Sequence, residues 1–188
     1  MLSPMCVAAI IRNLSILALG ATLAGAAGAL TLQVPGAPRV SSAQVFHGDG
    51  CDGGNLSPAL DWSAPPVGTK SLAVTMFDRD AAGGRGWWHW ILFDLPAGLR
   101  ALPANAAARL PEGAVQGRND FGLTGYGGPC PPRGDPAHHY VLTVWALRSA
   151  RLAVGGDASG AAIEAALRRD AIARARAILV YGRPAAAR

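Results

Sequence analysis

The chain has 188 residues, of which 51% are hydrophobic and 15% are charged. This length suits one domain, and large apolar residues spread along the chain exclude a disordered protein. Seventeen Lys and Arg residues against twelve Asp and Glu residues give a net charge of +5. A basic balance suggests nucleic acid, but the arginines that cluster near the end, Arg168, Arg169, Arg174 and Arg176, would point in several directions on a helix. We therefore interpret them as a solvated surface and expect no nucleic-acid partner.

The N-terminal segment predicts an export signal. Residues 14–29 carry no charge, follow Arg12 and end in small residues, which is the order of a secretory signal. We expect residues 1–26 to be the signal peptide, with cleavage after Ala26 or Ala29. The alternative is a transmembrane anchor, but the apolar run is shorter than the roughly 20 residues that a span needs. Residues 30–188 are then a single domain, periplasmic or secreted, with no stable membrane span after cleavage.

The next segments in chain order are rich in β-branched and aromatic residues, which favour strands. The strongest candidates are residues 71–77, 88–95 and 140–147, and shorter candidates are 30–34 and 177–181. The apolar runs of the three strong candidates are nearly continuous, which is typical of strands that are covered on both faces.

One stretch predicts a helix. Ser159 can cap it, Ile163 and Leu167 lie four residues apart, and the segment between them is rich in alanine. A second turn can follow through Ile172. We therefore expect a mainly β, antiparallel domain with one or two peripheral helices. Its long connections, residues 47–69 and 96–139, are expected to form the functional site.

Two cysteines, Cys51 and Cys130, remain after removal of the signal, since Cys6 is lost with it. An even pair in a small exported domain favours a disulfide. The alternative is two buried thiols that never meet.

Polar residues follow or precede the strong strands. Asp78 and Asp80 end the first, His89 lies within the second, and His138 and His139 precede the third. Residues at strand ends converge on one rim of a sheet, so this group can form a pocket. A metal site from these ligand types is the alternative, but their spacing is not diagnostic, and we predict neither metal nor cofactor.

These residue types suit an anion more than a reaction. The chain has no G-x-S-x-G, H-E-x-x-H or C-x-x-C motif. Imidazole N–H groups, the Tyr140 hydroxyl and backbone N–H groups of a Gly- and Pro-rich loop are directional donors for a phosphate-sized oxyanion. No catalytic residue is therefore predicted.

Five motifs carry a family resemblance over residues 45–183. They are Asn55-Leu56-Ser57-Pro58, Phe77-Asp78-Arg79-Asp80, Trp87-Trp88-His89-Trp90, Gly127-Gly128-Pro129-Cys130-Pro131-Pro132 with His138-His139-Tyr140, and Leu179-Val180-Tyr181-Gly182-Arg183. In this order the chain resembles the phosphatidylethanolamine-binding protein family, in its bacterial branch of Raf-kinase-inhibitor-like proteins. The resemblance implies a central antiparallel β-sheet packed with a smaller sheet, plus peripheral C-terminal helices.

The resemblance also implies the site. Its ligand-binding residues would be Asp78, His89, His138 and Tyr140, with a wall formed by Gly128, Cys130, Pro131 and Pro132. Asp80, Arg79 and His139 would support them. Both prolines of the family's Asp-Pro-Asp-x-Pro motif are absent here, so the loop after Asp78 is expected to be less rigid. His139 replaces the family's arginine, which pairs with acids of that loop, and Arg79 either compensates or reaches the ligand.

The function implied is that of an exported, non-enzymatic bacterial protein that binds a phosphate-like anion or a phospholipid headgroup. An inhibitor of a kinase or protease acting through the pocket loops is the alternative, and its protein partner is unknown. A metal- or histidine-dependent hydrolase ranks below both. A Cys51–Cys130 bridge would pin two pocket loops together, so we expect reduction to weaken ligand binding more than it lowers stability.

Overall fold

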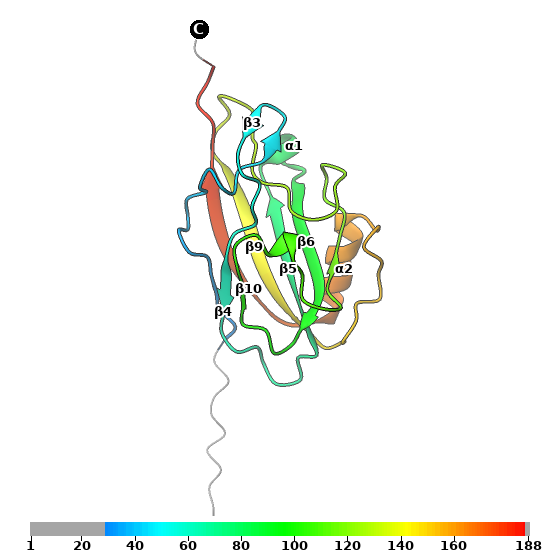
Figure 1. Cartoon of the computed structure of the whole chain (residues 1–188). Coiled ribbons are helices and arrows are strands. Elements are labelled where there is room, and N and C mark those ends of the chain that lie inside the picture. The colour runs from blue at the N-terminus through cyan, green and yellow to red at the C-terminus, as the bar shows by residue number, and fades with distance from the viewer. Residues whose placement is uncertain (1–28, 187–188) are drawn as a thin grey trace, which may run out of the picture.

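The computed structural model describes residues 29–186, and its centre is a five-stranded antiparallel sheet (Figure 1). The strand order is β10-β9-β5-β6-β8. The bounds are β5 Ser71–Asp78, β6 Trp87–Pro96, β8 Val115–Gln116, β9 His138–Leu147 and β10 Ala171–Tyr181. The three strong strand predictions therefore correspond to β5, β6 and β9. The predicted export signal, residues 1–26, lies outside the described residues.

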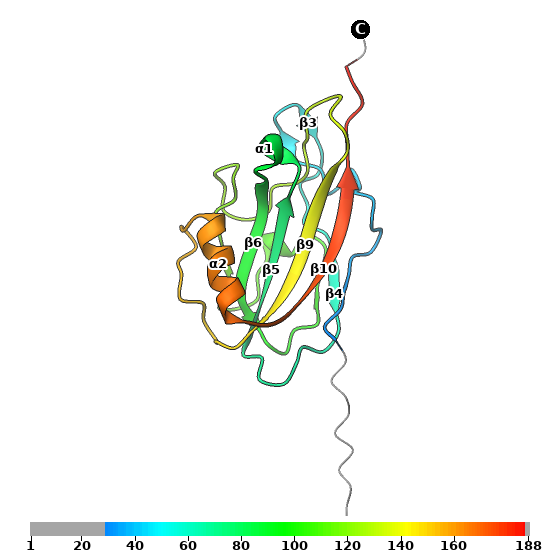
Figure 2. The same ribbon diagram turned by 180° about the vertical axis from the view of Figure 1, so that it is seen from behind.

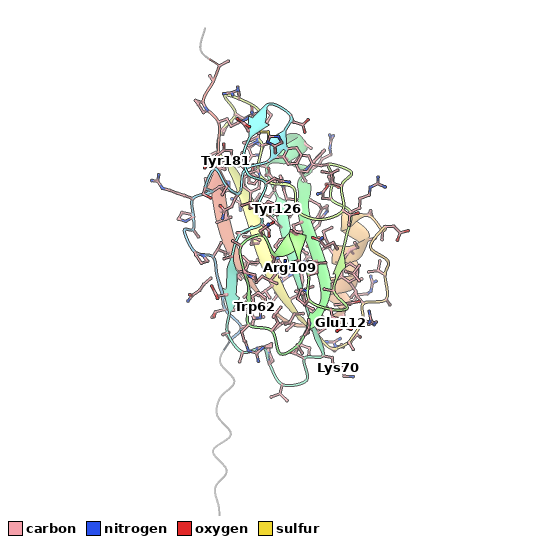
Figure 3. All side chains as sticks on the ribbon, viewed as in Figure 1. Trp62, Lys70, Arg109, Glu112, Tyr126 and Tyr181 are labelled. Carbon is pink, nitrogen blue, oxygen red and sulfur yellow. A yellow bond between two sulfur atoms is a disulfide. The ribbon has the colours of Figure 1, made fainter. Side chains whose placement is uncertain are left out.

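A smaller sheet and long loops cover one face of the central sheet, which we call the loop face. This second sheet has the order β1-β4-β7, with β1 Leu32–Gln33, β4 Leu60–Trp62 and β7 Ala101–Leu102. Alternate residues of β5, Leu72, Val74 and Met76, point into this layer and are fully buried. Trp62 and Tyr126, both labelled in Figure 3, pack in the same core from the covering layer.

Helix α2 (Gly160–Asp170) covers part of the opposite face, which we call the helix face (Figure 2). Ser159 caps it, because its side chain accepts a hydrogen bond from the backbone N–H of Ala162. Ile163 and Leu167 bury one side of the helix against Trp145 and the other apolar residues of that face. The central strands are therefore covered on both faces, as their continuous apolar runs predicted.

The remaining elements lie in the long connections. A hairpin joins β2 (His47–Gly48) to β3 (Cys51–Asp52), α1 spans Ala81–Gly84, and the 3-10 helix η1 spans Ala106–Ala108. None of the helices within residues 29–186 is long and apolar enough to cross a membrane. The architecture is the mainly β fold expected, with a smaller sheet packed on a larger one.

Two predicted elements have different bounds. The second helical turn through Ile172 was wrong, because α2 ends at Asp170 and the chain continues directly into β10. Alanine favours a helix, yet Ala173, Ala175 and Ala177 alternate onto the loop-face core while β10 pairs with β9. Tertiary packing overrides propensity there. The strand predicted at residues 30–34 is shorter, since β1 spans only Leu32–Gln33.

Strand register brings the sequence motifs to one end of the central sheet. Asp78 at the end of β5 lies opposite Tyr140 in β9, and Tyr181 at the end of β10 lies opposite His138. The β2–β3 hairpin and α1 lie at this same end (Figure 1). Three segments far apart in sequence therefore meet at one edge, which we call the pocket end.

Candidate binding pocket

Asp78 is the centre of the polar group at the pocket end. Its side chain is 3% exposed, and its two oxygens face two backbone N–H groups and two imidazole nitrogens. Oδ1 accepts the backbone N–H groups of Asp80 at 2.9 Å and Ala81 at 3.2 Å, which turns the chain out of β5. Oδ2 lies 2.7 Å from Nδ1 of His138 and 3.9 Å from Nε2 of His89. A single buried carboxylate thus positions both the loop and the histidines.

The two histidines expose equivalent nitrogens to the site. His89 Nδ1 lies 2.7 Å from the carbonyl oxygen of Gly127, which can only accept, so the proton is on Nδ1. His138 Nδ1 likewise donates to the Asp78 carboxylate. With Nδ1 engaged in this way, Nε2 is the remaining nitrogen of each ring. Burial lowers the pKa of His89, against the opposing effects of the Gly127 carbonyl and Asp78.

Tyr140 and Trp87 each bury a donor that has no partner. Among the described residues, the Tyr140 hydroxyl and the Trp87 indole N–H are the buried side-chain polar atoms without a hydrogen bond. Burial, followed by the negative charge of Asp78, raises the pKa of Tyr140 far above its usual range, so the hydroxyl keeps its proton. Leaving a buried donor unpaired costs about 1–3 kcal/mol. Both residues line the same cavity.

That cavity has a volume of about 560 Å³, within the usual range for small-molecule sites. Its lining is Asp49, Asp78, Asp80, Ala81, Ala82, Gly83, Trp87, His89, Phe121, Cys130, Pro131, Pro132, Asp135, His138 and Tyr140. Four of these residues are aspartates, and no Lys or Arg lines this cavity within residues 29–186. The pocket therefore combines two imidazole rings, a hydroxyl group and an indole N–H with an acidic rim.

A disulfide holds one wall of the pocket, as predicted. Cys51 of the β2–β3 hairpin is bonded to Cys130, which lies beside Pro131 and Pro132 in the lining. The same region is tied by backbone bonds as well, since the Phe46 N–H donates to the Pro129 carbonyl. The guanidinium of Arg183 donates to carbonyl groups of Gly50 and Pro131. The disulfide is thus one of several links between hairpin and wall.

Most of the predicted site residues come together, but three do not line the cavity. Gly128 packs against the backbone of residues 44–46, where a Cβ would lie 2.1 Å from the Gln44 carbonyl oxygen, and its N–H donates to Asn55 Oδ1. This N–H is therefore not available to a ligand. Arg79 is half-exposed, with its Nε 3.9 Å from Asp80 Oδ1, and lies outside the lining.

His139 lies outside the lining too, and it pairs with Asp80. Oδ2 of Asp80 accepts the backbone N–H of His139 at 2.6 Å and faces its Nδ1 at 2.8 Å. Burial is the largest single influence and raises the pKa of Asp80, but the hydrogen bonds from His139 and the neighbouring positive charge of Arg79 together outweigh it and lower the pKa overall. His139 thus takes up the pairing with the loop acid that the family resemblance gives to an arginine.

Sequence reasoning missed several lining residues. Trp87 could have been found, because it lies two residues before His89 in a strand and so shares its face. Phe121 gave no such signal: it comes from a glycine-rich loop and stacks on Phe46 at 4.3 Å between ring centroids. Asp49 and Asp135 also come from loops, where no periodicity places a side chain. Within the described part of the chain, no group of three His, Cys, Asp or Glu residues is arranged to hold a metal ion.

Comparison with known proteins agrees with this arrangement. Residues 37–182 match the family described as phosphatidylethanolamine-binding protein. The chain belongs to the phosphatidylethanolamine-binding protein family. The UPF0098 protein YbcL of Escherichia coli is 50% identical over 147 residues, which is 76% of this chain and 80% of YbcL. The UPF0098 protein YbhB of the same species is 48% identical over 122 residues, or 63% of this chain and 77% of YbhB.

The family fold is also found among solved structures. The crystal structure of E. coli YbcL, described as a new member of the mammalian PEBP family, superimposes with a TM-score of 0.78 at 45% identity. The match covers 82% of this chain and 99% of the YbcL chain. The phosphatidylethanolamine-binding protein fold therefore extends over nearly all the described residues.

Proposed function

We propose that this protein is an exported, non-enzymatic binding protein whose pocket holds a phosphate-ester headgroup. The observation that carries the proposal is the Tyr140 hydroxyl, a donor that is buried at the cavity without an acceptor. A phosphate oxygen there would supply the missing hydrogen bond. The Trp87 N–H is a further donor, and His89 and His138, whose Nδ1–H groups are already bonded, present Nε2 to the same space.

The acidic rim restricts the chemical class of ligand that we propose. A free phosphate dianion would approach Asp49, Asp80 and Asp135 with no lining Lys or Arg to offset the repulsion. Asp135 is 47% exposed, and its Oδ2 lies 3.8 Å from Nε2 of His138. A negative charge therefore lies beside the imidazole ring. A ligand that carries an ammonium group beside its phosphate can place the ammonium near the aspartates and the phosphate near the Tyr140 hydroxyl. We therefore favour phosphoethanolamine and its lipid esters over inorganic phosphate.

Protonation of His89 contributes further to phosphate binding. Burial lowers its pKa, so the free protein keeps this ring neutral, with Nε2 lacking a proton. A phosphate monoester can share its own proton with that nitrogen, whereas beside a diester, which carries no proton, the ring takes up a proton from solvent and donates it to a phosphate oxygen. In both cases the imidazole acts as a donor–acceptor partner of the phosphate, and no bond of the ligand needs to break.

Export is proposed from the sequence and is supported by the pocket wall. A Cys51–Cys130 disulfide is typical of oxidising compartments such as the periplasm. Leu30 is already buried in the core, so the domain begins directly after the predicted cleavage positions. N-terminal sequencing of the protein from a periplasmic extract should find Ala27 or Leu30 as the first residue. A cytoplasmic protein that retains Met1 would contradict export.

The decisive experiment removes one hydroxyl. Calorimetric titration with phosphoethanolamine should show an affinity about tenfold lower for Tyr140→Phe, because one hydrogen bond to a charged group is lost. The free variant should be as stable as the parent, since that hydroxyl has no partner to lose. Tyr126→Phe is the matched control: its buried hydroxyl donates to the Gln44 carbonyl, so it should lose stability and keep its affinity.

The same titrations test the other parts of the proposal. Equal affinity in Tyr140→Phe and the parent would contradict binding at this hydroxyl. Asp135→Asn should weaken phosphoethanolamine and strengthen inorganic phosphate, because it removes a rim charge. Recovery of intact phosphoethanolamine is expected, and release of inorganic phosphate would overturn the non-enzymatic assignment.

A further inference from the structure

Three arginines gather on the helix face, at the opposite end of the sheet from the pocket. We call Arg168, Arg174 and Arg176 the arginine cluster. Alternate residues of a strand share one face, so Arg174 and Arg176 both point outward from β10 between the exposed side chains of Ile172 and Ile178. Arg168 joins them from the last turn of α2. The several directions expected on a helix were wrong, because this segment is a strand.

A hollow lies beside the cluster, where α2 runs into β10. Figure 2 shows the junction of these two elements. Its volume is about 360 Å³, and it is lined by Trp145, Arg168, Ala171, Ile172, Ala173 and Arg174. The register of β10 on β9 shifts between Ala171 and Ala173, so Ile172 is an extra residue opposite the partner strand. This bulge interrupts the regular sheet surface beside the hollow.

The Trp145 ring in the lining of the hollow holds the guanidinium group of Arg174 in place. Trp145 is 1% exposed and its indole N–H donates to Thr75, so the ring is held in place. The guanidinium carbon of Arg174 lies 5.5 Å from the centre of that ring, which is a cation–π arrangement. An arginine held in this way keeps its N–H groups free and loses less side-chain entropy when it binds an anion.

The charges of the cluster are only partly compensated. Glu164 pairs with Arg168 one turn apart on α2. Arg174 and Arg176 form no ion pair within the described residues. Burial, followed by the positive charges of Arg174 and Arg168, lowers the pKa of Arg176, which shows how closely the cluster is packed. A bound anion would relieve this repulsion.

We propose that this hollow binds an oxyanion of the phosphate class, held by the guanidinium groups of Arg174 and Arg168 with Arg176 beside them. Planar guanidinium groups match two oxygens of one phosphate, and two arginines, Arg168 and Arg174, line this hollow. The site is independent of the pocket-end proposal. Free phosphate and the phosphodiester headgroup of an anionic lipid share this chemistry.

Titration with inorganic phosphate, followed by backbone amide NMR at constant ionic strength, tests the site residue by residue. Amide signals of residues 171–176 should shift and saturate. Arg174→Gln should weaken this binding about tenfold, since a hydrogen bond to a charged group is lost. Arg109→Gln removes the same charge from the opposite face and should leave the binding unchanged (Figure 3). Glu164→Gln should strengthen it about threefold, because a competing charge is removed.

The result that would overturn the proposal is the absence of saturating shifts at residues 171–176, or equal affinity in Arg174→Gln and Arg109→Gln. Shifts confined to pocket residues such as Ala81, His89 and Cys130 would report only the pocket end, so the two sites are distinguished in one spectrum. Co-sedimentation with phosphatidylglycerol vesicles, compared with phosphatidylcholine vesicles, separates the sources. Arg174-dependent sedimentation identifies a lipid headgroup, whereas saturable phosphate binding without sedimentation identifies free phosphate; both support the site.

Discussion

The cavities at the two ends of the central sheet are lined by side chains of opposite charge. At the pocket end, four aspartates and no Lys or Arg line the cavity within the described residues. At the other end, the hollow beside α2 is lined by Arg168 and Arg174. The net charge of +5 describes neither end. Ligand preference in a small domain therefore follows from the local placement of charge, and total charge is a poor guide to it.

The ends also differ in what stabilises them. A buried carboxylate, its hydrogen bonds and a disulfide organise the pocket end. Apolar packing of Ile163 and Leu167 under α2 organises the other. Polar networks depend on each member, while apolar cores tolerate modest change. Substitutions at the pocket end should accordingly cost more than comparable ones near α2.

The largest expected effect is that of Asp78→Asn. The asparagine side chain has the same shape, but only one of its two terminal atoms accepts hydrogen bonds. Either the His138 N–H or the loop N–H groups therefore lose their acceptor. We expect the free energy of unfolding to fall by about 3 kcal/mol, measured by urea denaturation. Asp61→Asn, at an exposed position of β4, is the control and should be nearly neutral. Similar losses in both variants would contradict the central role of Asp78.

Removal of the disulfide comes next. The bond closes a loop with a sequence separation of 79, for which the chain-entropy model gives at most about 4.5 kcal/mol. We expect Cys51→Ser with Cys130→Ser to lose about 2 kcal/mol of unfolding free energy, because the Arg183 bonds to the hairpin and wall remain. Phosphoethanolamine binding, measured by calorimetry, should lose more free energy than that. Unchanged affinity after reduction would show that the wall keeps its place without the bond.

The helix end should respond more weakly. Ser159→Ala removes the side chain that caps α2 and should lower the free energy of unfolding by about 1 kcal/mol, measured by thermal or urea unfolding. The pocket lies at the other end of the sheet, so phosphoethanolamine affinity should not change. A loss of affinity in this variant would show that the two ends are coupled. Ser149→Ala is unsuitable as a control, because Ser149 bonds to Asp170.

The smallest effect concerns pH. Burial lowers the pKa of His89 in the folded protein. Below the ordinary histidine pKa of about 6.5, this residue therefore binds a proton in the unfolded chain but stays neutral in the folded chain. The stability contributed by this group is therefore complete above about pH 6.5 and is lost as the pH falls toward the folded pKa. The melting temperature of the free protein should fall over this window. His89→Gln should flatten the profile, and His47→Gln, at an exposed hairpin position, should not.

Much of the fold could be predicted from the sequence because packing on both faces leaves continuous apolar runs. Residues 71–77, 88–95 and 140–147 therefore identified three central strands. The fourth, β10, was missed over half its length, since its alanines favour a helix when read alone. Its alternation of alanine with Ile172, Arg174 and Arg176 is a strand period, but the preceding helical segment masks it.

Most of the cavity lining belongs to the sequence motifs, and the lining residues that sequence reasoning missed lie mainly in loops outside those motifs. Asp78 and Tyr140 are paired by strand register, and His89 lies at the irregularity of β6 between Trp88 and Trp90. Phe121 and Asp135 depend on the path of long connections, which no local pattern determines. Gly128 belongs to the motif, yet its role is close packing against the backbone of residues 44–46. A motif residue is therefore not always a contact residue.

The pairing of β10 has a consequence for the order of folding. The Val180 N–H donates to the Pro38 carbonyl, and Arg39 forms a bridge with Val180, so segments from near the two limits of the domain meet. The helix-bearing segment comes between β9 and β10, and β9 cannot gain its outer neighbour until that segment has been made. Contacts of such large sequence separation slow folding. Until β10 docks, the folding domain exposes the unpaired edge of β9, where a strand of another molecule can pair.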